Sequence, residues 1–337
     1  MLPLLELRER VKNFYQRYDM YILPVLKFIF ALIVFNIINK EIGYDAKLKS
    51  LPIVLGVSLL SAFTPSAVMV LLSAVISIFH IYSVSPILSI MIIVILLILY
   101  LLFVRYTPKQ GYVLLAIPIL FRLKIPYMLP ILLGLTSTPV AIIPTACGVI
   151  IYFLIQIIKT AVTMQTSISV EDILQLYTYV VDSFIGNRQM IMTLVVFSLI
   201  ILVTYFIRKM SFNYAFEISI LAGGIISILG FLISFLLLNK TNQILSMIIG
   251  SIVSTGIVYI IHFFRLTLDY SRVEHATFED DVYYYYVKAV PKATVTLSEV
   301  NIRHYNVKGT KRREFSEPDT DDTDPYDYEE SDENEDN

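Results

Sequence analysis

The strongest candidates for chemistry in this 337-residue chain are hydroxyl side chains that stand beside prolines. They occur at two places within apolar stretches, Thr64-Pro65-Ser66 and Thr136-Ser137-Thr138-Pro139. Proline removes a backbone donor and clashes with the preceding turn, so each place should break a helix. In secondary transporters, broken helices offer hydroxyls and freed backbone groups to a substrate. We therefore predict a substrate-binding site between the two breaks; kinks that serve packing alone are the alternative.

Ionisable side chains inside apolar stretches are costly in a bilayer, so each one needs an explanation. Lys27 and Lys159 lie near enough to helix ends for the amine to reach the interface. Glu217 lies about one turn inside a span, where we expect it to pair with Arg208 or Lys209.

Metal and nucleophile chemistry has little support. His80 and His262 are far apart, and neither has a second ligand at i+3 or i+4. The single cysteine, Cys147, excludes a disulfide framework and fits a small buried hydrophobe better than a lone nucleophile. The H-E-x-x-H, G-x-S-x-G and phosphate-binding glycine motifs are all missing from the sequence. We therefore predict no enzyme activity, no metal and no cofactor.

The composition places these residues in a membrane. Apolar residues make up 56% of the chain and charged residues only 16%, whereas a soluble domain has about 25% charged residues. Uncharged runs of about 20 residues recur, which is the length that crosses a hydrocarbon core as a helix. They lack the period-2 alternation of barrel strands. The predicted fold class is an all-α polytopic membrane protein whose main partner is the lipid bilayer.

Six full transmembrane helices are predicted, running alternately outward and back. They cover residues 20–38, 86–104, 128–158, 190–207, 212–238 and 244–264. Residues 51–83 are predicted to form a re-entrant hairpin with its tip at Thr64–Ser66. Two ordinary spans, giving eight in all, or one long kinked helix are the alternatives. Residues 111–127 contain two prolines and have the same broken character on the cytoplasmic side.

Basic residues that flank the spans predict the orientation, because they gather on the cytoplasmic side. A cytoplasmic location of both termini places most of them together: the N-terminal group, Arg105, Lys109, Arg122, Lys124, Arg208, Lys209, Arg265 and Arg272. The weakest point of this scheme is the loop with Lys40, Lys47 and Lys49, which then lies outside.

The chain divides into four segments. Residues 1–19 are predicted as an interfacial amphipathic helix and residues 20–265 as the transmembrane domain. Residues 266–307 are a cytoplasmic segment with the β-prone sequence YYYYVKAVP. Residues 308–337 are an acidic tail, predicted to be disordered, with thirteen Asp or Glu and no Lys or Arg after residue 313.

Two further patterns concern packing. Residues 51–57 and 129–135 match at five of seven positions, which hints at an internal repeat. Small residues spaced for close helix packing mark the last two spans: Gly223, Ser227, Ser246, Gly250 and Ser254. We expect these two helices to pack against each other or against another subunit of a homo-oligomer or complex.

The sequence FEDDVYYYYVKAVP, attached to a proline-broken membrane body, resembles an uncharacterised family of bacterial multi-pass membrane proteins. Some members carry the label permease. The resemblance implies the bacterial cytoplasmic membrane and brings no activity or binding residues.

The predicted function is transporter-like, as a secondary carrier or a permease component. The alternative is a non-transporting scaffold that recruits a cytoplasmic protein through its tail, by strand addition or by contact with a basic surface. The basic residues are scattered along loops, so nucleic acid is not an expected partner.

Overall fold

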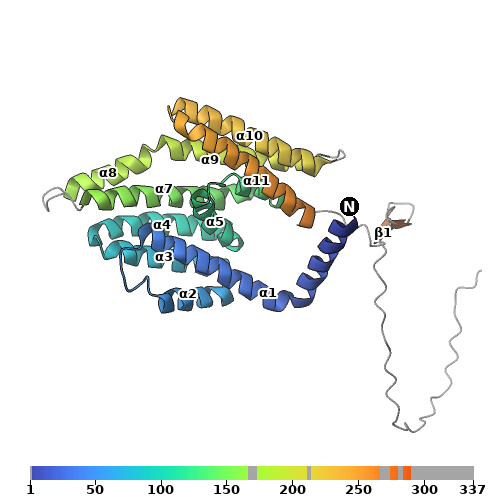
Figure 1. The fold of residues 1–337 in the computed structure, drawn as a ribbon, viewed down its shortest axis with the longest axis horizontal. Coiled ribbons are helices and arrows are strands. Elements are labelled where there is room, and N and C mark those ends of the chain that lie inside the picture. Colours follow the sequence, from blue (N-terminus) through green and yellow to red (C-terminus); the bar gives the residue numbers. More distant parts are fainter. Residues whose placement is uncertain (1, 166–172, 211–213, 266–273, 280–283, 290–337) are drawn as a thin grey trace, which may run out of the picture. The chain divides into compact units, whose positions relative to one another are not determined.

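The computed structural model describes residues 2–165, 173–210, 214–265, 274–279 and 284–289. The helices are α1 (Leu2–Ile42), α2 (Leu51–Phe63), α3 (Ser66–Tyr82), α4 (Pro86–Tyr106), η1 (Pro108–Gln110), α5 (Gly111–Arg122), α6 (Met128–Thr136), η2 (Pro139–Ala141), α7 (Ile142–Gln165), α8 (Ile173–Ile185), α9 (Arg188–Lys209), α10 (Ala215–Leu237), η4 (Thr241–Gln243) and α11 (Ile244–Arg265). Figure 1 shows most of the long helices running side by side.

Six helical stretches are long and apolar enough to cross a membrane. They are Arg17–Ile42, Pro86–Tyr106, Pro139–Met164, Thr178–Lys209, Ala215–Leu237 and Thr241–Phe264. The predicted all-α polytopic membrane fold, with six full spans and additional proline-broken segments, is confirmed. One predicted boundary is wrong: residues 128–158 form two helices, α6 and α7, because the chain leaves the helical conformation at Ser137 and Thr138.

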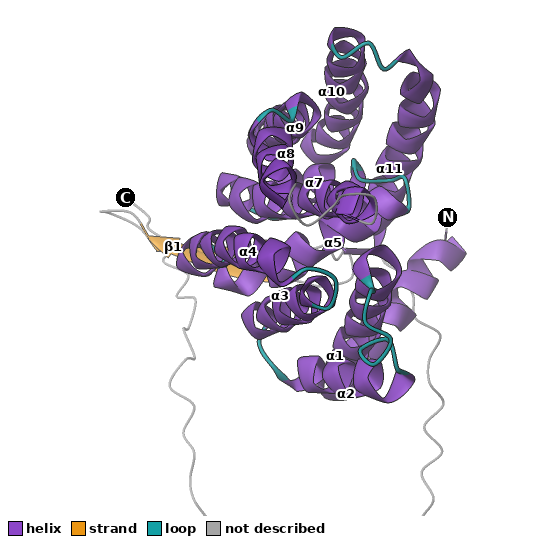
Figure 2. Ribbon diagram, turned by 90° about the vertical axis from the view of Figure 1, so that its left-hand side faces the viewer, coloured by secondary structure: helices purple, strands orange, loops and turns teal. Residues whose placement is uncertain are grey.

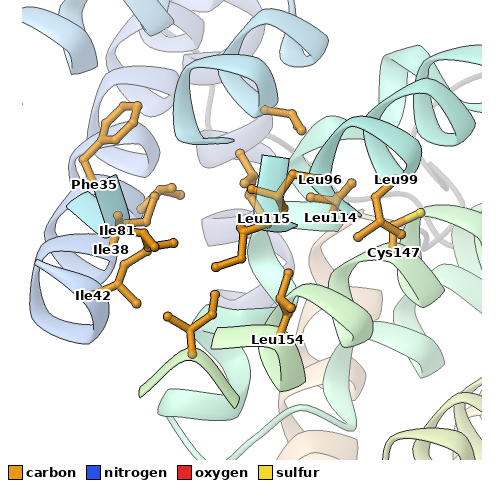
Figure 3. Packing of buried hydrophobic residues seen from close by; sticks show 14 of the residues in the cluster. Phe35, Ile38, Ile42, Ile81, Leu96, Leu99, Leu114, Leu115, Cys147 and Leu154 are labelled. Atoms are coloured by element: carbon orange, nitrogen blue, oxygen red, sulfur yellow. The ribbon is translucent and has the colours of Figure 1, made fainter. Parts of the chain in front are cut away.

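The buried apolar side chains form two clusters that share α5 and α7. The first cluster joins α1, α3 and α4 to these two helices; Figure 3 shows Phe35, Leu115 and Leu154 among its members. The second cluster joins α6, α9, α10 and α11 to the same pair. The view in Figure 2 shows α5 and α7 lying between the two groups of helices. These two helices therefore hold the halves of the transmembrane domain together.

The helix α1 bends at Tyr18, where φ is −123° and ψ is 21°. Before the bend, Leu7, Val11 and Phe14 are exposed at spacings that place them on one face. The bend lies where the sequence separates a surface helix from the first span, and Figure 1 shows the N-terminal part turning aside. The location of this part on the membrane surface stays a prediction.

The two short apolar helices α2 and α3 meet at Thr64 and Pro65, as the proline predicts. Ser66, the first residue of α3, donates a hydrogen bond of 3.0 Å to the carbonyl of Pro108, just after α4. Since α3 packs against α4 and a three-residue connection joins them, the two helices are antiparallel and lie side by side. The tip of the hairpin thus lies level with the C-terminus of α4. Its re-entrant course in the bilayer stays a prediction.

The helix α5 ends in a tight turn that reverses the chain into α6. The amide of Ile125 donates to the carbonyl of Leu120 at 3.0 Å, and Lys124 adopts the left-handed conformation with φ of 61°. This is the hydrogen-bond pattern of a Schellman turn. The proline that follows, Pro126, cannot continue α5. Two short helices, each too short to span a bilayer, therefore replace one long one at the centre of the domain.

The C-terminal segment contains an antiparallel hairpin of β1 (Glu274–Glu279) and β2 (Tyr284–Ala289). Its register pairs Glu274 with Ala289 and Glu279 with Tyr284. The strand β2 falls within the tyrosine-rich sequence expected to be extended. The predicted disordered tail of residues 308–337 lies outside the described residues.

Two of the small residues predicted for packing, Gly223 and Ser227, pack against different helices. A Cβ added at Gly223 would lie 2.8 Å from Oγ1 of Thr204 on α9. Ser227 of α10 contacts Ser251 of α11 through their hydroxyls. The last two spans do pack against each other, and α10 also packs closely against α9.

The other three small residues lie on α11. A Cβ at Gly250 would lie 2.6 Å from the carbonyl oxygen of Lys124, so the bare backbone of α11 rests on the turn between α5 and α6. Ser254 is buried, whereas Ser246 is exposed and takes no part in this packing. The turn after α5 is thus fixed from the second half of the domain.

We predict that Gly250→Ala destabilises the protein, because the new methyl group meets a backbone oxygen at 2.6 Å that cannot move away freely. Overpacking of this kind costs about 1–3 kcal/mol. Gly256→Ala on the same helix is the matched control, since a Cβ there meets nothing within 4 Å. Thermal unfolding in detergent measures the difference; equal stabilities of the two variants would contradict the close approach at Gly250.

Candidate functional site

The two predicted breaks lie at the same end of the helices and contact a common linker, residues 107–110. Ser66 from the first break donates to the carbonyl of Pro108 at 3.0 Å. From the other side, Nε2 of Gln110 donates to Oγ of Ser137 in the second break at 3.2 Å. Gly111 follows directly, where a Cβ would lie 2.5 Å from the carbonyl oxygen of Ser66. The linker is therefore packed tightly between the breaks.

Arg208 completes this group by capping α6. Its guanidinium donates to the carbonyl of Leu135 and, at 3.1 Å, to that of Ser137. The last carbonyls of a helix have no partner within the helix and carry the negative end of its dipole, so a cation there is stabilising. We call Ser66, Pro108, Gln110, Ser137 and Arg208 the linker site.

The expected pairing of Glu217 with Arg208 or Lys209 is wrong. In the described part of the chain, Oε1 of Glu217 lies 3.7 Å from Nε2 of His262. Arg208 is held at the end of α6 instead, because the break exposes carbonyls directly beside α9. Sequence spacing along α9 and α10 gives no sign of this competitor.

The remaining residues of the two breaks are engaged locally or lie at the surface. The hydroxyl of Thr64 donates to the carbonyl of Ser61 at 3.4 Å, and that of Thr136 to Leu132 at 2.8 Å. Thr138 and Pro65 are exposed, and Pro139 is half-buried at the start of η2. The breaks therefore form a joint between helices, and substrate binding at their hydroxyls stays a prediction.

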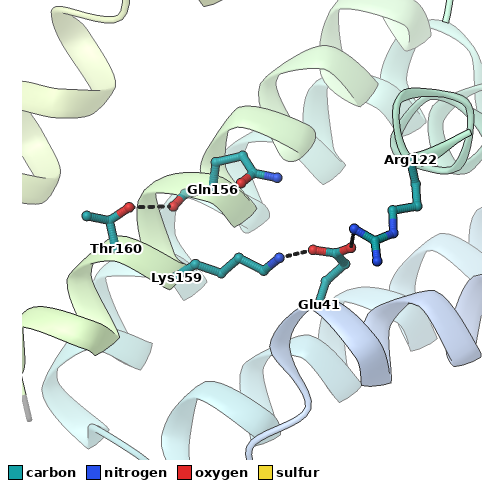
Figure 4. Close-up of polar contacts among 5 residues, drawn as sticks. All are labelled: Glu41, Arg122, Gln156, Lys159 and Thr160. Carbon is teal, nitrogen blue, oxygen red and sulfur yellow. Dashed lines mark hydrogen bonds and ion pairs between the residues drawn. The ribbon is translucent and has the colours of Figure 1, made fainter. Parts of the chain in front are cut away.

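A second polar cluster joins α1, α5 and α7. Glu41, next to the last residue of α1, forms an ion pair with Nζ of Lys159, and Nη1 of Arg122 lies 3.4 Å from its other carboxylate oxygen. Figure 4 shows the two cationic side chains reaching this carboxylate from α5 and α7. We call these three residues the Glu41 triad.

The Glu41 triad and the linker site lie toward opposite ends of α3. Near the C-terminus of α3, Nε2 of His80 is 2.8 Å from Oδ1 of Asn39, two residues before Glu41. Ser66 at the other end is separated from His80 by about 21 Å of helix. The prediction that Arg122 shares a side with Arg105 is therefore wrong, since α5 carries Arg122 away from the linker and toward Glu41.

The three side chains of the Glu41 triad differ in how far they are exposed, and this difference separates their roles. The side chain of Glu41 is 10% exposed, that of Lys159 34% and that of Arg122 63%. A carboxylate removed from water needs a partner of opposite charge. The more buried Lys159 supplies most of this pairing, while the exposed guanidinium of Arg122 is screened by solvent.

A cavity of about 300 Å³ lies beside the triad, between α1, α3, α4, α5 and α7. This volume is at the lower end of the range of about 300–1,000 Å³ for ligand pockets. Most of its wall is apolar, including Val34, Val70, Leu96 and Leu115. Polar groups on the wall are Ser73, Ser77, Tyr100, Tyr152, Gln156, Lys124 and the Glu41 triad. An apolar chamber with a charged patch is an arrangement that binds small ligands.

The wall between α5 and α7 is shaped by a proline and a glycine. Pro118 has no amide hydrogen, so the carbonyl of Leu114 lacks its partner within α5. A Cβ at Gly148 would lie 2.7 Å from this carbonyl oxygen, so α7 approaches α5 closely there. One turn later, the rings of Phe121 and Tyr152 stack with centroids 4.1 Å apart.

The residues predicted at the breaks do not line this cavity. Sequence reasoning missed Glu41 and interpreted Lys159 as a lysine that reaches the interface. The available signal was an acid and a base near the ends of two different spans. Recognising them as a pair requires knowing that α1 and α7 are neighbours, which hydropathy does not reveal.

Among the described residues, no group of three or more His, Cys, Asp and Glu is placed to hold a metal ion. Cys147 is buried in the first hydrophobic cluster. Comparison of the chain with protein-family models, with curated proteins and with solved structures gave no match.

We predict that Glu41 and Lys159 couple more strongly than Glu41 and Arg122. A double-mutant cycle with Glu41→Gln, Lys159→Met and Arg122→Gln measures both couplings from the free energy of unfolding in detergent. The expected coupling is about 1–3 kcal/mol for the buried pair and below about 1 kcal/mol for the exposed one. A larger coupling with Arg122 would show that the division of roles by burial is wrong.

Proposed function

We propose that this integral membrane protein is a carrier or permease component that binds its substrate in the cavity beside the Glu41 triad. The observation that carries the proposal is a chamber of about 300 Å³ within the helices, with one carboxylate and several cationic groups on an otherwise apolar wall. Ionisable residues within a transmembrane domain mark substrate pathways by default, because they are costly there.

The linker site serves as the gate of this cavity in our proposal. Val70 and Leu114 on the cavity wall follow Ser66 and Gln110 by four residues each, about 6 Å of helix. The short helix η1 replaces an α-helical turn there, and side-chain hydrogen bonds join it to the two breaks. Oε1 of Gln110 is buried without a partner among the described residues, so it could accept a new hydrogen bond if the one from Gln110 to Ser137 broke. Such an exchange of hydrogen bonds would open the cavity toward the linker end.

We also propose that the linker end faces the cytoplasm, with both termini on that side. The helix α1 ends at the Glu41 triad, so its start lies toward the linker end. Glu217, in the first turn of α10, pairs with His262 near the end of α11, so α11 ends on the same side as α10 begins. Basic residues at this end are Arg105, Lys109, Arg208, Lys209 and Arg265. These residues favour a cytoplasmic location of this end, whereas Lys40, Lys47, Lys49, Arg122 and Lys124 lie toward the opposite end.

A carrier exposes its binding site to each side of the membrane in turn. In a Cys147→Ser background, we predict that Ser77→Cys on the cavity wall reacts with a membrane-impermeant thiol reagent from both sides. Labelling of intact cells and of inside-out vesicles measures access from the two sides. Ser254→Cys, which is buried between helices and away from the cavity, should stay unlabelled in both.

The same experiment separates the cavity from the breaks as the site of access. Thr64→Ala with Thr138→Ala should leave labelling of Ser77→Cys unchanged, because these hydroxyls bond locally or lie at the surface. Labelling from only one side, or none, would count against alternating access and in favour of a scaffold.

The hairpin β1–β2 favours a second function, a scaffold that recruits a partner through the C-terminal segment. A two-stranded hairpin alone is at best marginally stable in water. Strand addition to the sheet of another protein would extend the ladder and stabilise it. This proposal keeps a role for the tyrosine-rich strand β2 that transport does not use.

We predict that Val287→Pro abolishes recruitment if the scaffold exists, because proline cannot donate in the ladder and Val287 pairs with Ala276. Affinity purification of the full-length protein, and of residues 266–337 alone, measures partner recovery. Glu329→Pro in the acidic tail is the control and should retain the partner. Failure of the unmodified protein to recover any specific partner would remove the main support for this function.

A further inference from the structure

We propose that the ligand of the cavity is an amphiphile with one anionic head group and a single apolar chain. This inference rests on the proposed carrier function and names its substrate class. The head group would meet Arg122 at the charged end of the cavity, and the chain would lie against the apolar wall.

The charge of the cavity wall favours an anion. Glu41 contributes the one acidic side chain, whereas Arg122, Lys124 and Lys159 contribute three basic ones. Glu41 neutralises one of these, so two positive charges remain in excess. A ligand with a single negative charge is attracted to this wall, and a cationic ligand is repelled.

Arg122 is the side chain best placed to receive the head group. Its Nη1 lies 3.4 Å from Oε1 of Glu41, whereas a strong charge-assisted hydrogen bond is about 2.7–2.9 Å long. The guanidinium is thus loosely held and largely exposed, with five donors that match carboxylate or phosphate oxygens in pairs. Lys159 remains with Glu41, which keeps the carboxylate from competing for Arg122.

The rest of the wall fits an apolar chain. Ile38, Ala74, Leu96 and Ile155 come from four different helices, so apolar contact surrounds the chain. Hydroxyls such as those of Ser73 and Ser77 already donate to carbonyls of their own helix. A cavity of about 300 Å³ has room for one short chain, which disfavours a ligand with two long ones.

This chemistry has two possible sources, an amphiphile free in water or the head group and one chain of an anionic membrane lipid. The test uses the Ser77→Cys protein in the Cys147→Ser background, in nanodiscs of zwitterionic phosphatidylcholine. Decanoate and decyl phosphate should slow thiol labelling at least about tenfold at saturation, because they occupy the cavity. Decanol and decyltrimethylammonium should leave the rate unchanged at the same concentration.

Nanodiscs that contain phosphatidylglycerol distinguish the sources. Slow labelling without any additive would support the inference with a membrane lipid as ligand. Protection by added decanoate, without any effect of phosphatidylglycerol, would support it with a free amphiphile as ligand. Equal protection by decanol and decanoate would overturn the anionic head group.

Variants test the assigned contacts. Arg122→Gln should raise the decanoate concentration that gives half-maximal protection about tenfold, since a hydrogen bond to a charged group is lost. Lys47→Gln, an exposed base in the loop after α1 and away from the cavity wall, is the matched control and should not change protection. Ala74→Leu should abolish protection by filling the cavity. An unchanged half-maximal decanoate concentration in Arg122→Gln would overturn the role of Arg122.

The carrier function and the ligand class can fail separately. Labelling from both sides without protection by either anion would overturn the ligand class and leave the carrier standing. Protection by decanoate with access from one side only would support the ligand class and overturn the carrier. Labelling of Asp182→Cys, on the exposed face of α8, should be insensitive to every amphiphile and reports damage to the nanodisc.

Discussion

The arrangement of this protein depends on the backbone groups that a broken helix leaves without partners inside the helix. Where the breaks are packed against other helices, these groups find partners within the protein. Ser66 finds Pro108, and the freed end of α6 finds Arg208. Because these contacts converge on one linker, the two breaks are brought together, and α5 must start between them. The position of α5 then determines the cavity wall and brings Arg122 to Glu41.

A second constraint is the cost of moving a charge out of water. Glu41 is almost buried, and Lys159 from α7 pairs with it across the first helical cluster. This pair joins the start of the domain to its middle, where α1 and α7 approach each other over only a short stretch. Arg122 adds a looser contact that leaves most of its guanidinium exposed. The tight pair thus serves structure, and the loose one is available for binding.

Hydropathy and proline positions predict the spans and the breaks, because both are local properties of the chain. They fail where a residue's position depends on which helices pack together: Arg122 was assigned to the wrong end, and Lys159 was given no partner. The length of α5 explains the first error, since the chain reverses at Lys124 before it leaves the membrane domain. Small residues predicted close packing at Gly223 and Gly250, but their partners on α9 and in the turn after α5 lie far away in sequence.

The size of the cavity bears on the choice between carrier and scaffold. At about 300 Å³ the cavity is large enough for a small ligand, and most of its wall is apolar. Covering this wall with an apolar ligand is favourable. A carrier needs such a site, whereas a scaffold has no use for it. Since the linker site lies about one turn from the cavity wall, a ligand in the cavity would also act on the contacts that join the two breaks. In our proposal, this links ligand binding to the gate.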